Sequence, residues 1–223
     1  MPRPPSRRLS PLRQLVQLMA TLRSPEGCPW DREQDHRSLR FHAVEEVYEL
    51  VDAIDAGDDH EMAEELGDLL LQVVFHCQLA AERNAFNLDR VAQLLVDKLV
   101  RRHPHVFGDT RVRGVDEVWA NWDRIKRAEK KDTPRARPSA LDGIPRHLPA
   151  LLKAEKLSKK ARKAGLPETN PPAPPPSRHA IARALFDLAA AAQAKGWSAE
   201  ALLRAEIDRR ERRWRRLESP QPR

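Results

Sequence analysis

Two neighbouring acidic motifs within residues 41–78 constrain the fold of this chain more than any other feature. The first motif reads Glu-Glu-x-x-Glu, the second reads Glu-x-x-Asp, and 15 residues separate them. The acids of the two motifs are Glu45, Glu46, Glu49, Glu65 and Asp68. Residues three apart on a helix share a face, and apolar residues recur at helical spacing beside both motifs. The stretch therefore predicts two helices with packed apolar stripes, whose acids converge at one end of the seam.

Converging carboxylates repel one another, and burial raises the cost of keeping them ionised. Hard divalent cations offset this cost, and Mg²⁺ typically takes one or two carboxylates together with substrate phosphates and water. Helix bundles build such sites from Glu residues on facing helices. A solvated acidic face explains any single pair of acids at this spacing. Two pairs on consecutive helices, each beside an apolar stripe, favour a metal site.

The remaining apolar patterns also have the period of a helix. Helices are predicted over residues 12–22, 42–56, 60–83, 88–102, 115–131, 150–164 and 180–217, the last broken near Gly196. No stretch has a convincing period of two, and no apolar run approaches membrane-spanning length. The N-terminal apolar stretch is interrupted by Gln14 and Gln17, so it is not expected to be a signal peptide. The predicted fold class is all-α, a helical bundle.

Prolines, 19 in number, mark the expected interruptions. Residues 132–149 have recurrent prolines without periodicity and are interpreted as a linker, and the Pro-rich stretch 167–176 cannot be regular. Residues 24–31 carry Pro and Gly at alternate positions, which excludes regular structure there. Asp31 is expected to cap the next short helix. Trp30, in this rigid loop, could stack on a base or fill the core, and core filling is favoured.

Charge is distributed unevenly over the chain. Its net charge is +7, but residues 41–100 hold 14 acids and 3 bases, a net of −11, so the remainder carries +18. An acidic metal centre in basic surroundings suits a polyanionic ligand held through metal ions, whereas a basic exterior alone would indicate nucleic acid. The C-terminal helix mixes Arg with Glu, as on a solvated helix with paired charges. Nucleic acid is therefore not the expected partner.

Lys98, Arg101 and Arg102 lie within one helical turn after the acidic stretch. Cations at a helix C-terminus are favourable in themselves, yet the same groups would serve phosphate oxygens equally well. Trp122, with Lys126 one turn further, could hold a base and a phosphate or could pack in a core. The two cysteines lack metal-ligand spacing and suit a reducing cytoplasm.

Together these stretches resemble the MazG family of nucleoside triphosphate pyrophosphohydrolases, within the wider all-α nucleotide pyrophosphatase superfamily. The resemblance rests on Gly27-Cys28-Pro29-Trp30-Asp31, Glu45-Glu46-x-x-Glu49, Glu65-Leu-Gly-Asp68-Leu-Leu, Lys98-Leu-x-Arg101-Arg102-His103-Pro104-His105-Val106-Phe107, Trp122 with Lys126, and Ser139-Ala-Leu-Asp142-Gly-Ile-Pro145. It extends over residues 10–165 in one collinear match.

The resemblance implies an all-α homodimer in the cytoplasm that uses Mg²⁺, for which Mn²⁺ could substitute. The implied reaction hydrolyses NTPs or dNTPs to the monophosphate and pyrophosphate, including the clearance of non-standard nucleotides. The implied metal ligands are Glu46, Glu49, Glu65 and Asp68. These four and Glu45 are the implied catalytic residues. The role of Glu45 as ligand, base or support stays open. The implied substrate contacts are Lys98, Arg101, Arg102, Trp122 and Lys126.

Family members often carry two tandem copies of the domain, and this chain departs from that pattern. Residues 1–131 are interpreted as the catalytic domain and residues 150–223 as a degenerate second copy. In the second half the first acidic motif is missing and the second has lost its acids. The alternative function is a non-catalytic helical binding or regulatory protein that kept the fold. Retention of all four expected ligands in the first half favours the enzyme.

Overall fold

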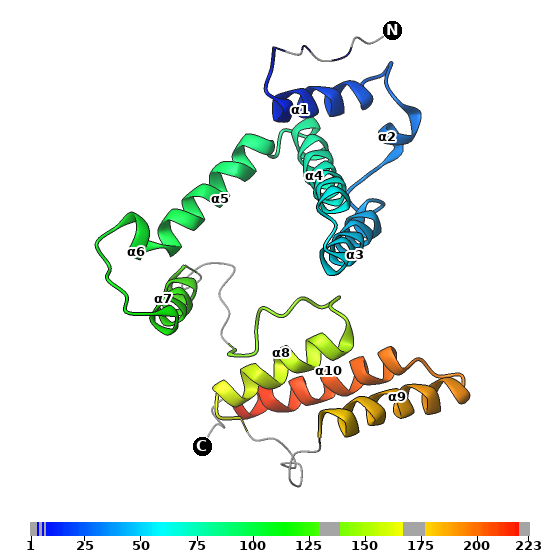
Figure 1. Cartoon of the computed structure of the whole chain (residues 1–223), viewed down its shortest axis with the longest axis vertical. Coiled ribbons are helices and arrows are strands. Elements are labelled where there is room, and N and C mark those ends of the chain that lie inside the picture. The colour runs from blue at the N-terminus through cyan, green and yellow to red at the C-terminus, as the bar shows by residue number, and fades with distance from the viewer. Residues whose placement is uncertain (1–3, 5, 7, 130–138, 167–176, 219–223) are drawn as a thin grey trace. The chain divides into compact units, whose positions relative to one another are not determined.

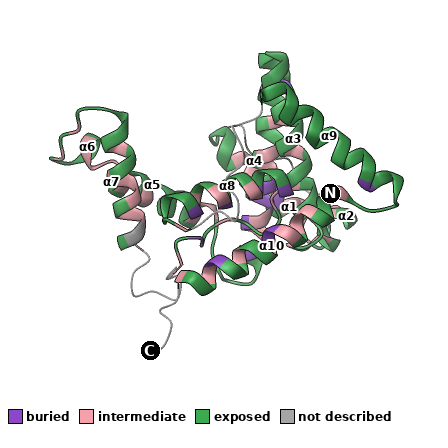
Figure 2. Ribbon diagram, turned by 90° about the horizontal axis from the view of Figure 1, so that it is seen from below, coloured by how far each residue is buried: buried purple, intermediate pink, exposed green. Residues whose placement is uncertain are grey.

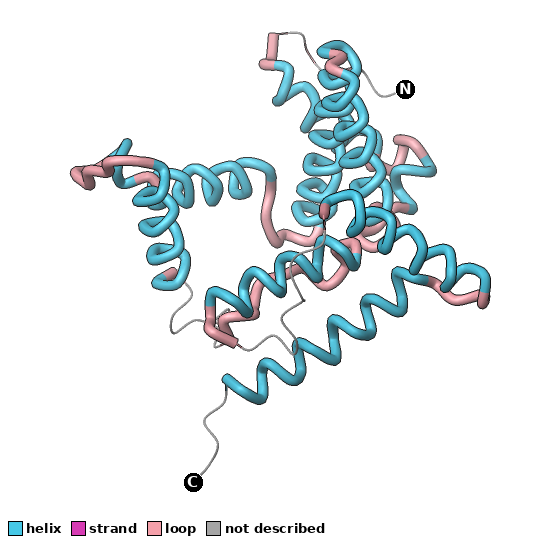
Figure 3. Tube along the Cα trace, turned by 60° about the horizontal axis from the view of Figure 1, so that its bottom comes forward, coloured by secondary structure: helices cyan, strands magenta, loops and turns pink. Residues whose placement is uncertain are grey.

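The computed structural model describes residues 4, 6, 8–129, 139–166 and 177–218. Over these residues the chain is built from helices and loops without strands, which confirms the predicted all-α class (Figure 3). The helices are α1 Pro11–Leu22, α2 Pro29–Glu33, α3 Arg40–Ala56, α4 Asp59–Glu82, α5 Leu88–Arg102, α6 Pro104–Phe107, α7 Val115–Ala128, α8 Ala150–Lys163, α9 Arg178–Ala194 and α10 Ala199–Glu218. They form two compact units, Met1–Trp122 and Asp123–Arg223, that divide within α7.

A tight turn joins α3 to α4 and sets the geometry of the first unit. Gly57 ends α3 in the left-handed conformation, with a φ of 69° that glycine adopts without steric cost. Asp58 then caps α4, because its side chain accepts hydrogen bonds from the backbone N–H of His60 at 2.9 Å and Glu61 at 3.1 Å. The two helices run back along each other (Figure 1). Both acidic motifs therefore lie on one helical hairpin, as the sequence predicted.

The core of the first unit forms where α1 packs on α4. Its buried residues are Met19, Leu39, Val74, Phe75 and Leu79. The apolar stripes predicted to pack between α3 and α4 are largely outside this core, and that prediction is wrong for most of their members. Val44, Val47, Val51, Ile54, Leu66, Leu70 and Val73 are 39–54% exposed. Ala53 is the buried residue of α3, and much of the hairpin is exposed (Figure 2), so these large apolar side chains remain accessible on it.

The loop before α3 departs from its prediction. Its last residues form α2, which begins at Pro29 with Cys28 as the N-cap, so Asp31 lies in the first turn and is not the cap. Proline suits this first helical position because its missing N–H would have no helical partner there. The expected core-filling role of Trp30 is also wrong, since its side chain is 52% exposed. Helix α6, immediately after α5, was not predicted.

The second unit packs α8 against α10. Its buried core consists of Leu141, Ala150, Leu157, Ala161, Ile207 and Trp214. Leu141 belongs to the segment interpreted as a linker, so residues 139–149 are part of this unit, while residues 132–138 lie outside the described residues. The Pro-rich stretch 167–176 is also outside them. The predicted break near Gly196 is confirmed, with a φ of 71° at that residue.

Candidate functional site

Three carboxylates of the two acidic motifs meet on the α3–α4 hairpin. One carboxylate oxygen from each of Glu46, Glu49 and Glu65 lies within 4.8 Å of the other two. Helix α3 supplies the first two residues, one turn apart, and α4 supplies the third. Glu46 and Glu65 are half-buried, whereas Glu49 is exposed. Three carboxylates gathered in this way, here called the carboxylate cluster, could hold one hard cation through their oxygens.

Asp68 lies beside the carboxylate cluster without belonging to its closest group. Its charge raises the pKa of both Glu46 and Glu65, so it is electrostatically coupled to them. Glu45 is exposed on α3, and its carboxylate lies 3.6 Å from Nδ1 of His42. The structure therefore brings together Glu46, Glu49 and Glu65, with Asp68 as a near neighbour.

Burial and mutual repulsion make the carboxylate cluster costly without a cation. Burial is the largest cause raising the pKa of Glu46, followed by the charges of Asp68 and Glu49. Burial is likewise the largest cause raising the pKa of Glu65, followed by the charge of Glu49. Oε2 of Glu65 is buried and has no hydrogen-bond partner. A divalent ion would satisfy that oxygen and offset the repulsion, so the residues present fit a metal.

Gln72 is a member of the site that sequence reasoning missed. Its side chain is 7% exposed, and its Nε2 donates to Oε1 of Glu46 at 3.4 Å. Its own Oε1 is buried and has no partner. The available signal was a polar residue one turn after Asp68, inside an otherwise apolar run on α4. Gln72 holds the Glu46 carboxylate and counters the effect of burial on its pKa.

The three cations lie on the C-terminal half of α5. This helix contacts α4 near the loop that joins them and then runs away from the hairpin (Figure 1). Arg101 donates weakly to the backbone carbonyl of Asp97 at 3.5 Å, and the Arg102 guanidinium lies 5.9 Å from the centroid of the Trp122 ring. In this single chain the expected phosphate contacts are therefore not placed against the carboxylate cluster.

Trp122 belongs to an aromatic group around the end of α5. Its ring centroid is 5.9 Å from that of His103 and 5.7 Å from that of Trp119, both in edge-to-face geometry. Trp122 is half-buried, and Lys126 follows one turn later on α7. The structure thus brings Arg102 and Trp122 together, but it leaves both apart from the acids.

The stretch of sequence that carries this site is similar to a known protein family. A sequence model described as the MazG nucleotide pyrophosphohydrolase domain matches residues 34–107, which include both acidic motifs and all three cations of α5. The chain is also 45% identical over 152 residues to a nucleoside triphosphate pyrophosphohydrolase of Escherichia coli, covering 68% of this chain and 57% of that protein. The chain belongs to the MazG family.

Other MazG relatives differ in how much of their length is shared. A 26.1 kDa protein of Streptomyces cacaoi is 43% identical over 193 residues, which cover 86% of this chain and 76% of that protein. Protein YabN of Bacillus subtilis is 49% identical over 142 residues, only 28% of its length. A crystal structure of a mazG-related protein from Thermotoga maritima overlays with a TM-score of 0.44 and 24% identity, covering 51% of this chain and 97% of that one. The chain thus spans little more than half of its Escherichia coli relative.

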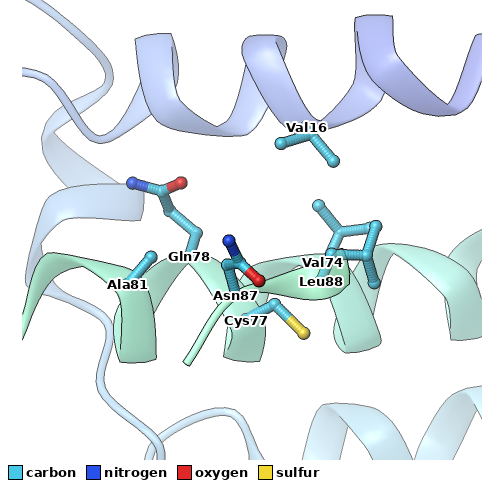
Figure 4. Close-up of a pocket in the computed structure, with 7 residues that line it drawn as sticks. All are labelled: Val16, Val74, Cys77, Gln78, Ala81, Asn87 and Leu88. Atoms are coloured by element: carbon cyan, nitrogen blue, oxygen red, sulfur yellow. The ribbon is translucent and has the colours of Figure 1, made fainter. Parts of the chain in front are cut away.

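A small cavity in the first unit lies away from the carboxylate cluster. It has a volume of about 70 Å³ and lies between α1, α4 and the start of α5 (Figure 4). Its lining consists of Val16, Val74, Cys77, Gln78, Ala81, Asn87 and Leu88. Ligand pockets commonly measure about 300–1,000 Å³, so this cavity is too small to hold a ligand of ordinary size.

Proposed function

We propose that this chain is a Mg²⁺-dependent nucleoside triphosphate pyrophosphohydrolase that converts NTPs or dNTPs, including non-standard ones, to the monophosphate and pyrophosphate. The observation that carries the proposal is the carboxylate cluster with its orphaned buried oxygen, within the region that matches the MazG family. Names of relatives support the reaction class. Glu46, Glu49, Glu65 and Asp68 would hold the metal, and Mn²⁺ would substitute for Mg²⁺.

In the proposed reaction a water oxygen bonds to the α-phosphorus and the bond from that phosphorus to the bridging oxygen breaks. Pyrophosphate leaves with the electron pair of the broken bond. A divalent cation held by these carboxylates would supply a water of lowered pKa and would neutralise charge on the leaving group. A carboxylate not saturated by metal, with Glu45 as a candidate, accepts the proton of the water. Lys98, Arg101 and Arg102 neutralise phosphate oxygens, and Trp122 and Lys126 contact the rest of the nucleotide.

We further propose that the protein acts as a homodimer. The apolar surface of the α3–α4 hairpin supports this, because monomers rarely expose contiguous apolar patches larger than a few hundred Å². The position of the α5 cations supports it too, since a second copy could bring its own α5 to the carboxylate cluster. The free thiols Cys28 and Cys77 suit a cytoplasmic location.

The proposed catalytic domain is residues 1–131, and residues 150–223 are proposed to be a degenerate second copy. Among the described residues, acids spaced to hold one cation gather in the α3–α4 cluster and nowhere in the second unit. The second unit instead uses its acids in ion pairs, such as Asp208 with Lys153 at 2.8 Å and Asp142 with Arg215 at 2.8 Å. The competing function, a non-catalytic binding or regulatory protein, predicts binding without turnover.

Product analysis tests the enzyme against this alternative. The purified full chain is incubated with Mg²⁺ and a panel of canonical and damaged NTPs and dNTPs, beside Glu49→Ala. The matched control is Glu64→Gln, an exposed acid of α4 that pairs with His60 at 3.6 Å. We expect monophosphate and pyrophosphate from the wild type and from the control, and none from Glu49→Ala. No turnover by a folded, metal-bound wild type would instead establish the non-catalytic alternative.

A further inference from the structure

Trp30 presents a large aromatic surface although its ring is held from two sides. Its side chain is 52% exposed. Its ring centroid lies 6.1 Å from that of His42, with the planes at 67°, and 6.5 Å from that of Phe75, with the planes at 82°. Both contacts have the edge-to-face geometry that aromatic pairs prefer. The indole is therefore fixed in orientation while about half of its surface stays open.

The open indole lies at the end of the hairpin that carries the acids. His42 precedes Glu46 by four residues on α3, and residues so spaced are neighbours on one face. Phe75 follows Gln72 by three residues on α4, and Gln72 bonds Glu46 at 3.4 Å. Along their helices, His42 and Phe75 thus lie about one turn, roughly 5.4 Å of helix length, from Glu46 of the carboxylate cluster and from Gln72, which bonds to Glu46.

The backbone around Trp30 is fixed before any ligand arrives. Arg23 donates to the carbonyls of Asp31 and Gln34, the latter at 3.2 Å. A Cβ on Gly27 would lie 2.1 Å from the carbonyl oxygen of Leu22, so only glycine fits there. Ordering a binding group in advance removes part of the entropic cost of binding. The loop therefore holds the indole as a preformed surface.

We propose that Trp30 is the stacking platform for the nucleobase of the substrate, an inference that rests on the proposed nucleotide pyrophosphohydrolase activity. Phosphates at the carboxylate cluster would leave the base to extend along the hairpin toward the indole. Every base has a π-face, so stacking of this kind tolerates different bases. Stacking on Trp30 would contribute affinity for nucleotides of any base, so selectivity among bases would have to come from other groups. Trp122, proposed above as a nucleotide contact, is less suited to stack on the base, because its ring already lies against Trp119, His103 and Arg102.

The test compares a nucleotide with a ligand that has phosphates and no base. The full chain with Mg²⁺ is titrated calorimetrically with an α,β-imido nucleoside triphosphate, which resists the proposed cleavage, and in parallel with inorganic tripolyphosphate. Stacking of about 1–3 kcal/mol per base converts to a loss of nucleotide affinity of roughly 5- to 140-fold in Trp30→Ala. We expect tripolyphosphate binding to be unchanged and Trp30→Phe to keep most of the nucleotide affinity. Trp197→Ala, at an exposed Trp of the second unit, is the matched control.

Unchanged nucleotide affinity in Trp30→Ala would overturn the proposal. Equal losses of affinity for the nucleotide and for tripolyphosphate would also overturn it, because they would mean that the loop affects phosphate binding at the carboxylate cluster. If Trp30→Ala does not fold, Trp30→Leu replaces it, because Leu keeps the apolar contact with Phe75 but has no π-face. Nucleotide must then bind more weakly to Trp30→Leu than to Trp30→Phe, and equal affinities refute stacking. Failure of the wild type to turn over any triphosphate would count against the proposed function, whereas turnover with unaffected Trp30 variants would count against the platform alone.

Discussion

Replacing Arg23 by Met should destabilise the first unit far more than replacing any surface arginine. The Arg23 side chain is 9% exposed and forms two hydrogen bonds to the carboxylate of Glu82, at 2.7 and 2.8 Å. It also donates to the carbonyls of Asp31 and Gln34, and its guanidinium lies 5.6 Å from the centroid of the Phe75 ring. One side chain thus ties the end of α1 to α2 and α4.

The expected loss depends on how buried each partner is. Removing one member of a fully buried ion pair costs about 3–5 kcal/mol. The Glu82 side chain is 37% exposed, so solvent screening reduces that figure, and we expect Arg23→Met to lower the free energy of unfolding by about 2–3 kcal/mol. For a chain of this size the corresponding fall in Tm is roughly 4–12 °C. Urea and thermal unfolding followed by circular dichroism measure both quantities.

The pH dependence of this difference gives an independent check. The Arg23 hydrogen bonds lower the pKa of Glu82 below its ordinary value. A lowered pKa in the folded state contributes stability that is present above the unfolded pKa and is lost as pH falls through the folded pKa. The gap between wild type and Arg23→Met should therefore be largest near neutral pH and shrink in acid below about pH 4.

Arg13→Met is the control for this experiment. Arg13 and Asp89 form an ion pair at 3.2 Å with side chains 60% and 64% exposed, and such surface pairs are worth about 0–1 kcal/mol. The reasoning is refuted if Arg23→Met costs no more than Arg13→Met, or if its cost does not change between neutral and acid pH. Either result would mean that water replaces Arg23 without loss.

Three further outcomes are expected. Mg²⁺ should raise the Tm of the wild type but not the Tm of Glu65→Gln. Without metal, Glu65→Gln should be more stable than the wild type at neutral pH, because it removes a carboxylate whose pKa is raised by burial. Differential scanning fluorimetry measures both differences in Tm. Val47→Glu, on the exposed hairpin surface, should shift a homodimer to monomer in light scattering. Asp208→Ala should destabilise more than Lys153→Met, because it leaves the buried Lys153 charge unpaired, and urea unfolding ranks them.

Each of these has an opposing outcome. Equal Mg²⁺ responses in the wild type and Glu65→Gln would remove Glu65 from the metal site. A Val47→Glu protein that keeps the mass of the wild type would place any dimer contact elsewhere. Lys153→Met costing as much as Asp208→Ala would mean that the packing of the lysine stem, and not its charge, is needed by the second unit.

The amino-acid sequence by itself determined the helices, the hairpin and the acids. Helical spacing is a local property, so the periodic apolar residues and the three-residue intervals of the two motifs are enough to place the paired carboxylates on helix faces. The Gly57-Asp58 turn is also local, since glycine alone adopts its backbone conformation freely and the aspartate caps α4. A short turn between two helices leaves an antiparallel pair as the natural arrangement, which brings the motifs together.

Only the tertiary structure decided which side of each helix is covered. The apolar residues of α3 and α4 are periodic whether they face a partner helix or solvent, so their spacing could not show that Ala53 is buried while Val47 stays exposed. Gln72 facing inward and Trp30 facing outward depend in the same way on contacts between segments distant in sequence. The packing of Leu141 on α8 and α10 likewise shows that a proline-rich stretch without periodicity can be part of a core. Such contacts depend on how whole elements cross, and no local pattern encodes that crossing.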